Sequence, residues 1–212
     1  MTEMNELNVN HYNNDLTNNA FGNFVGDYII KLSKCFTDEM NSKIYELAYN
    51  LKDAWRDRNN IFICGNGGSG GNAIHIANDF IYGTGACGAG DKIPGLKVNA
   101  LTSNPAILTC LANDTGFENI FSYQLKVKAE RNDILIALSG SGNSPNIVSA
   151  IETANNIGLK TFGILAFDGG KCKDIVKYPL HFKVNDMQVA EDIQLIIGHL
   201  CMQWLSENKP IF

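Results

Sequence analysis

The sequence predicts an α/β protein, a three-layer αβα sandwich around a five-stranded parallel sheet, with two helices before the first strand. Short apolar runs alternate with stretches of helical periodicity, as they do in parallel sheets that are covered on both faces. Two loops rich in glycine each follow an apolar run and precede a helical stretch. Apolar residues make up 45% and charged residues 18% of the 212-residue chain, which is the composition of a globular protein.

The chain before the first predicted strand divides into an arm and two helices. Residues 1–19 are crowded with asparagine, which favours turns, so we expect a flexible arm there. Between residues 20 and 59 the apolar residues recur at steps of three and four, which indicates two amphipathic helices. We therefore predict a single domain over residues 20–212 that includes both helices.

The remaining elements follow in alternation. Apolar runs predict strands at 61–64, 96–101, 133–138, 161–167 and 178–184. Helical stretches are predicted at 70–82, 105–130, 144–157 and 187–206. Ligands of such sheets bind beyond the carboxyl ends of the strands, which is where both glycine-rich loops fall.

Charge and cysteine usage narrow the partners and the compartment. The net charge is −5 and no dense basic cluster occurs, so direct binding to nucleic acid or to anionic lipid is not expected. The six cysteines form no CxxC pair, which is typical of reduced thiols in the cytoplasm. The sequence has neither a leader pattern nor an apolar stretch of spanning length, so we expect neither export nor membrane insertion.

The first loop runs from Gly65 to Gly71 between a strand and a helix. Its glycines allow a close approach of the main chain to a ligand, and the N–H groups of the next helix face an anion or a sugar. Gly65, Gly67 and Gly70 also match the GxGxxG fingerprint of dinucleotide-binding proteins. That interpretation lacks its ribose anchor, because no acidic residue ends the second predicted strand.

The second loop contains Ser139, Ser141 and Ser144 interleaved with glycines, again between a strand and a helix. Hydroxyl and backbone donors together form a neutral cradle that can bind phosphate without lysine. The competing interpretation is a plain turn, with Ser144 as helix N-cap and Pro145 in the first turn. Two such loops at equivalent places in one sheet favour the phosphate cradle.

The sequence has a strand, the loop GNGGS and a helix, followed later by a strand, the loop SGSGNS and a helix. This order resembles the SIS (sugar isomerase) domain family, and within it the phosphoheptose isomerases. The similarity runs from about residue 20 to residue 206 and includes His75, the segment 112–117 and Gln194. The resemblance implies a homotetramer with sites near the subunit interfaces, acting on a small-molecule sugar phosphate. It also implies the following binding residues: Ser139, Gly140, Ser141 and Ser144 for the phosphate, and Asn66, Gly67, Gly68, Ser69, Asn113 and Asp114 around the sugar.

The resemblance implies catalytic roles for His75, Asp79 and Gln194, which are also the candidate ligands of a zinc ion. The family has glutamate at the position of Asp79, which is longer by about 1.5 Å. It also pairs its glutamine with a histidine eight residues later, and counting from Gln194 that position is Met202. His199 would point elsewhere on the helix, about 140° from Gln194. Glu191, one turn before Gln194, is the carboxylate that could act in place of the histidine.

The implied reaction is aldose–ketose isomerisation of sedoheptulose 7-phosphate to D-glycero-D-manno-heptose 7-phosphate through an enediol, with Asp79 as base. Two alternatives remain open. One is a non-catalytic SIS protein that binds a sugar phosphate or associates with a replication initiator, because the carboxylate at Asp79 is changed and the second histidine is missing. The other is an isomerase of another phosphosugar in which Glu191 takes part.

Overall fold

The computed structural model describes residues 20–211 of the chain. Of the described residues, 20–36 belong to one compact unit and those from Thr37 onward to another. The predicted arm, residues 1–19, lies outside the described residues, and a single domain over 20–212 stays a prediction. None of the described helices is long and apolar enough to cross a membrane.

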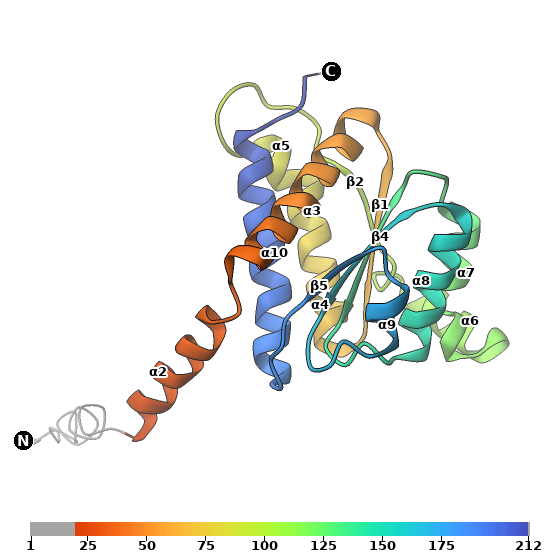
Figure 1. Cartoon of the computed structure of the whole chain (residues 1–212). Coiled ribbons are helices and arrows are strands. Elements are labelled where there is room, and N and C mark those ends of the chain that lie inside the picture. Colours follow the sequence, from red (N-terminus) through yellow and green to blue (C-terminus); the bar gives the residue numbers. More distant parts are fainter. Residues whose placement is uncertain (1–19, 212) are drawn as a thin grey trace, which may run out of the picture. The chain divides into compact units, whose positions relative to one another are not determined.

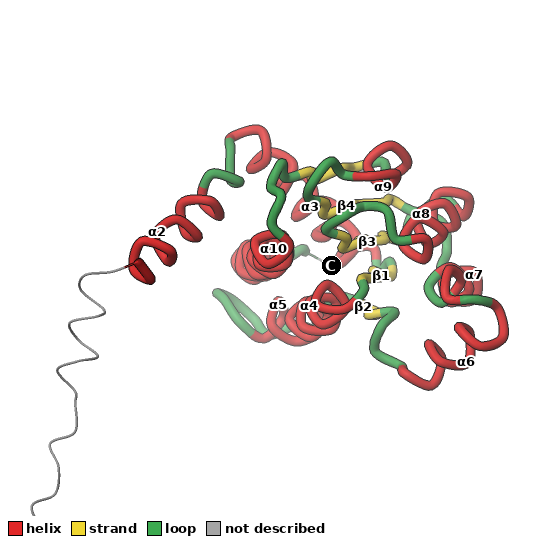
Figure 2. The backbone as a smooth tube through the Cα atoms, turned by 90° about the horizontal axis from the view of Figure 1, so that it is seen from below, coloured by secondary structure: helices red, strands yellow, loops and turns green. Residues whose placement is uncertain are grey.

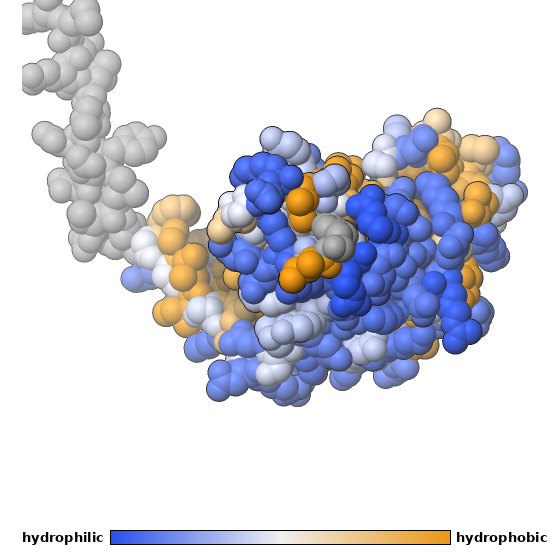
Figure 3. Space-filling model, turned by 90° about the horizontal axis from the view of Figure 1, so that it is seen from above, coloured by the Kyte–Doolittle hydropathy of each residue, from blue (hydrophilic) through white to orange (hydrophobic). Residues whose placement is uncertain are grey.

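The first unit contains helix α2 (Ala20–Ser33). Many side chains of this helix are apolar, and Figure 3 shows them as hydrophobic patches along the helix. Phe21, Phe24, Ile29 and Ile30 are each more than half exposed. Exposed apolar side chains that lie close together are typical of surfaces that contact a partner.

The second unit is built on a parallel sheet with the strand order β2-β1-β3-β4-β5 (Figure 1). The five strands are β1 (Asn60–Gly65), β2 (Lys97–Ala100), β3 (Ile134–Ser139), β4 (Lys160–Leu165) and β5 (Tyr178–His181). All neighbouring strands run parallel, and β1, β3 and β4 are buried over nearly their whole length. The predicted five-stranded parallel sheet is confirmed.

Helices cover both faces of this sheet, so the predicted three layers are present (Figure 2). One face carries α3 (Asp38–Asp57), α4 (Gly67–Asn78) and α10 (Met187–Glu207). The other carries α7 (Ser122–Lys128), α8 (Pro145–Ile157) and the short α9 (Gly170–Ile175). The Thr37 side chain caps α3 by accepting a hydrogen bond from the Met40 N–H, and Asp186 caps α10 through the Val189 N–H.

Two segments differ from the predicted elements. The predicted helical stretch 105–130 is broken into α6 (Pro105–Thr115), a 3-10 turn (Phe117–Asn119) and α7. The break falls at Gly116, whose φ of 94° lies outside the range that an α-helix can use. The helix predicted over 70–82 is α4 followed by a π-helix (Asp79–Gly83) and the single turn α5 (Thr84–Ala86).

Candidate functional site

The two glycine-rich loops meet at one cavity, beyond the carboxyl ends of the adjacent strands β1 and β3. The helix after β1 covers one face of the sheet and the helix after β3 covers the other, which makes this place the topological switch point. The cavity has a volume of about 280 Å³. It is lined by Asn66, Gly67, Gly68, Ser69, Leu138, Ser139, Gly140, Ser141, Ser144, Met187 and Glu191.

The serine loop presents its hydroxyl groups as hydrogen-bond donors. Ser139 Oγ accepts a hydrogen bond from the Gly142 N–H at 3.1 Å, and Ser141 Oγ accepts one from the Asn143 N–H at 3.3 Å. Ser144 occupies the N-cap position of α8 without making a side-chain capping bond. Because the backbone already occupies an acceptor site on two of these oxygens, their O–H protons remain for a ligand that only accepts, such as phosphate.

The first loop forms the opposite wall of the cavity. Gly67 and Gly68 are exposed, and Ser69 is buried behind them. The Glu191 carboxylate from α10 packs directly against Gly68, and a Cβ there would displace it. Asn66 is the N-cap residue of α4, yet its side chain makes no capping bond, which forgoes a contribution of about 1 kcal/mol. The cavity therefore has a neutral hydroxyl wall and a wall that carries one carboxylate.

A second polar cluster lies further along α4 and α10, which run side by side (Figure 1). The Nε2 atoms of His75 and His199 are 3.0 Å apart. The Oδ2 atom of Asp79 lies 3.5 Å from each of them. His75 and Asp79 come from successive turns of the same helix, and Asp79 is the first residue of the π-helix.

Three nitrogen and oxygen atoms at these separations fit a transition-metal ion. Tetrahedral zinc holds such ligands at about 2.0–2.1 Å and therefore about 3.3 Å from one another. A triangle with sides of 3.0, 3.5 and 3.5 Å has its centre about 1.9 Å from every corner. The donor set of two imidazoles and one carboxylate is also one that zinc prefers, with a fourth position left open.

Helices α4 and α10 come close enough for this cluster because of Gly198. A Cβ at residue 198 would lie 2.5 Å from Cγ1 and 2.9 Å from Cδ1 of Ile76. Ile76 follows His75 in the chain, and Gly198 precedes His199. The missing side chain at 198 thus lets the two histidines meet.

Replacing Gly198 with alanine is expected to lower the free energy of unfolding by about 1–3 kcal/mol, because the added methyl group overpacks the helix contact. Gly71→Ala in α4 is the matched control, since nothing lies within 4 Å of a Cβ there. That variant is expected to gain up to about 1 kcal/mol from helix propensity. Urea unfolding of both variants measures the difference, and equal effects would contradict the close packing of the two helices at Gly198.

The sequence-based interpretation of α10 is wrong at His199. Gln194 is 1% exposed, and its Oε1 accepts a hydrogen bond from Asn72 at 3.2 Å while its Nε2 has no described partner. The angle of about 140° between Gln194 and His199 therefore does not show which side chains of α10 face His75, because Gln194 itself does not face it. The expected spacing of eight residues between a polar residue and a histidine is kept by Glu191 and His199. A count of eight residues from Glu191 instead of Gln194 would have assigned His199 as the histidine of the site.

The other residues that the resemblance implied are partly brought together. Asn66, Gly67, Gly68, Ser69, Ser139, Gly140, Ser141 and Ser144 all line the cavity. Asn113 and Asp114 do not line it: they are exposed on α6, where the Asn113 Nδ2 donates to Asp114 Oδ1 at 2.8 Å. Met202 packs against Gly83: its sulfur lies 3.4 Å from the place where a Cβ at residue 83 would be.

Cysteine chemistry is disfavoured at this site. Burial raises the pKa of the Cys64 thiol far above its ordinary value, one residue before the first loop. Burial also raises the pKa of Cys172 to about 11 and that of Cys201 to about 12. These thiols stay protonated at neutral pH and are poor nucleophiles.

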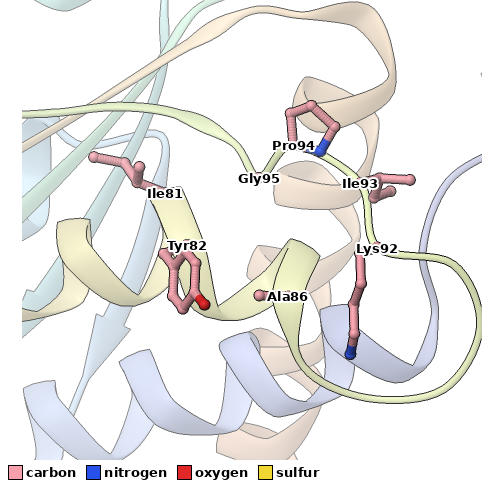
Figure 4. Close-up of a pocket in the computed structure, with 7 residues that line it drawn as sticks. All are labelled: Ile81, Tyr82, Ala86, Lys92, Ile93, Pro94 and Gly95. Carbon is pink, nitrogen blue, oxygen red and sulfur yellow. The ribbon is translucent and has the colours of Figure 1, made fainter.

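A separate cavity of about 380 Å³ lies beside the π-helix and shares no residue with the loop cavity. Figure 4 shows the apolar side chains of Ile81 and Ile93 around it, with the Lys92 ammonium at its margin. It offers no convergent set of polar groups, so the loop cavity is the candidate site.

Comparison with known proteins agrees with the geometry of the loops. The SIS domain family matches residues 26–166. A phosphoheptose isomerase of Trichlorobacter lovleyi is 35% identical over 170 residues, which cover 80% of this chain and 84% of that protein. One of Crocosphaera subtropica is 40% identical over 146 residues, which cover 68% of this chain and 72% of that protein.

Among solved structures, a phosphoheptose isomerase from Francisella tularensis superposes with a TM-score of 0.78 at 22% identity. The superposition covers 89% of this chain and 97% of that chain. A phosphoheptose isomerase from Neisseria gonorrhoeae gives the same TM-score at 23% identity, over 87% of this chain and 96% of that chain. At this level of identity the likeness establishes the fold.

Proposed function

The chain belongs to the phosphoheptose isomerases of the SIS domain family, and on that premise we propose that it converts sedoheptulose 7-phosphate to D-glycero-D-manno-heptose 7-phosphate. The observation that carries this proposal is the loop cavity, where Ser139, Ser141 and Ser144 converge opposite the glycine wall. Serine hydroxyls and the Gly140 backbone hold the phosphate, and the wall from Asn66 to Ser69 faces the sugar. Binding energy from the phosphate fixes the reacting carbons.

The reaction needs only proton transfers. A base removes a proton from C1 of the ketose while an acid protonates the carbonyl oxygen at C2, which gives the enediol. Return of a proton to C2 and loss of the proton on O1 complete the aldose. Asp79 is the proposed base: its Oδ2 faces both histidines, whereas its Oδ1 has only a 3.5 Å contact with the Asn78 amide. When their Nε2 atoms hold no metal ion, His75 and His199 are the groups placed to hold or return the oxygen proton.

A zinc ion fits the cluster of His75, Asp79 and His199 better than the set with Gln194 that the resemblance implied. The Gln194 amide oxygen is engaged by Asn72, and its nitrogen is a donor that cannot ligate a cation. When bound, such an ion supplies Lewis-acid polarisation of the substrate oxygens. Within this chain, His75 and His199 contact the Asp79 carboxylate and orient it.

The presence of His199 in the cluster bears on the alternatives. A non-catalytic sugar-phosphate-binding protein, or one that associates with a replication initiator, was favoured by the changed carboxylate at Asp79 and by a missing histidine, and the second reason no longer holds. An isomerase of another phosphosugar with Glu191 in an acid–base role keeps one supporting observation, because the Glu191 carboxylate lines the cavity. Glu191 would in that case act on the sugar end that lies against Gly68.

We propose in addition that the protein works as a homotetramer with its sites near subunit interfaces. From Gly68 to Asp79 the helical path rises about 16 Å at 1.5 Å per residue. An extended seven-carbon sugar phosphate is only about 10 Å long at ordinary single-bond lengths. One substrate is therefore too short to reach from Gly68 to Asp79 of the same chain, which supports a site that a neighbouring chain completes. The exposed apolar residues of α2 offer a surface for contact between chains. The six free cysteines support a cytoplasmic location.

Ser144→Ala tests the phosphate cradle. Loss of one hydroxyl donor to a dianion is expected to raise KM for sedoheptulose 7-phosphate about 10- to 100-fold, as for a hydrogen bond to a charged group. Ser149→Ala, in the same helix but outside the cavity, is the control and should behave as the wild type. Steady-state kinetics and calorimetric binding of the substrate measure the change. Unchanged affinity in Ser144→Ala would contradict the assignment of the cradle.

A further inference from the structure

A reciprocal pair of side-chain amides joins the two loops. Asn66 Nδ2 donates to Asn146 Oδ1 at 2.9 Å, and Asn146 Nδ2 donates to Asn66 Oδ1 at 2.8 Å. Asn66 follows β1 directly, and Asn146 lies in the first turn of α8, just after the serine loop. The Asn146 side chain is 0% exposed. Each amide therefore uses both its donor and its acceptor on the other.

This pair replaces a local interaction that Asn66 would otherwise make. Asn66 stands at the N-cap of α4, where an asparagine side chain ordinarily accepts a hydrogen bond from the helix, and it makes no such bond. Its amide is directed across the sheet instead. An amide that is held on both atoms is also not directed at a ligand, so Asn66 lines the cavity chiefly with its backbone.

The pair lies where the sheet ceases to hold the two loops together. The ladder between β1 and β3 ends at Gly65 opposite Leu138, one residue before Asn66 and Ser139 respectively. Within residues 20–211, the Asn66–Asn146 pair is the only side-chain hydrogen bonding between the first loop and the segment 139–146. The separation of the two cavity walls beyond the sheet thus depends on these amides.

We propose that Asn146 is a positioning residue, which, through Asn66, fixes the distance between the phosphate cradle and the wall that contacts the sugar. Its role in turnover rests on the proposed function, whereas its effect on binding does not. Only a primary amide donates and accepts at both ends of such a pair, so neither aspartate nor alanine replaces it. An error of about 1 Å in the placement of a substrate can cost a reaction about 100-fold in rate.

The experiment compares Asn146→Ala, Asn146→Asp, Asn66→Ala and the double alanine variant in the full chain. Inorganic phosphate and sedoheptulose 7-phosphate are titrated by calorimetry, and turnover is measured separately. We expect affinity for inorganic phosphate to stay within about 2-fold of wild type, because the serine loop is intact. Affinity for the sugar phosphate should fall about 10-fold or more, and kcat about 10- to 100-fold. Asn156→Ala, an exposed position on the same helix, is the control.

The two single alanine variants should show non-additive losses, with the double variant no worse than either alone, because each removes the same pair. Additive losses, or equal loss of affinity for both ligands, would overturn the proposal. If circular dichroism shows that Asn146→Ala does not fold, Asn66→Ala tests the same pair from its partly exposed end. A wild-type protein that binds both ligands without turnover would contradict the proposed function and leave the binding test of the pair intact.

Discussion

Asp79→Asn is expected to lower kcat for sedoheptulose 7-phosphate by about 10³-fold, within the 10²- to 10⁴-fold range that general acid–base groups contribute. Asparagine keeps the size of the side chain but cannot take a proton from carbon. KM should change little, because the phosphate cradle lies in the loop before α8 and outside the cluster that contains Asp79. Coupled spectrophotometric assay of the aldose product measures the effect.

Two further variants sharpen this result. Asp79→Glu keeps the carboxylate but moves it by about 1.5 Å, so an intermediate loss is expected. Asp174→Asn changes an exposed carboxylate that does not line the loop cavity and should have no effect. If Asp79→Asn retained wild-type turnover, the base would have to be another carboxylate, and Glu191 in the loop cavity is the one to test next.

His199→Gln is expected to weaken binding of a divalent transition metal by about 100-fold or more, since even outer partners of metal ligands contribute 10- to 100-fold. Co²⁺ titration of chelator-treated protein reports this directly, because four-coordinate Co²⁺ absorbs in the visible range. His181→Gln is the matched control: its Nε2 contacts the Phe167 carbonyl oxygen and lies outside the cluster.

The same titration separates the two assignments of the metal ligands. Gln194→Leu should leave the Co²⁺ spectrum unchanged if His75, Asp79 and His199 hold the ion. A spectrum that responds to Gln194→Leu and not to His199→Gln would restore the assignment made from the sequence. Thermal unfolding of each variant without metal shows whether the substitution also affects stability.

Local patterns in the sequence were enough to predict the sheet and the loop cavity. The apolar run before Gly65 and the one before Ser139 each specify a buried strand, and the residues that follow suit only a loop that opens a helix. Parallel order then brings both loops to one edge of the sheet. For these reasons the sequence alone places the serine hydroxyls opposite the Gly67 backbone.

Features that depend on contacts between helices could not be predicted in the same way. The meeting of His75 with His199 requires the close approach at Gly198, which is a property of two helices far apart in sequence. The Asn66–Asn146 pair joins residues that are 80 positions apart in sequence and has no periodic signature. Asn113 and Asp114 were assigned by resemblance alone, and they lie exposed on α6, just before the break at Gly116.

Incubating the full chain with sedoheptulose 7-phosphate in D₂O and following the sugar by NMR tests isomerisation most directly. If a carboxylate moves a proton between the first two carbons, the heptose 7-phosphate should form and carry deuterium at its C2, with the phosphorus resonance shifted on binding. A protein that shifts the phosphorus resonance but yields neither aldose nor deuterium would be a binding protein, and that result would contradict the proposed isomerase activity.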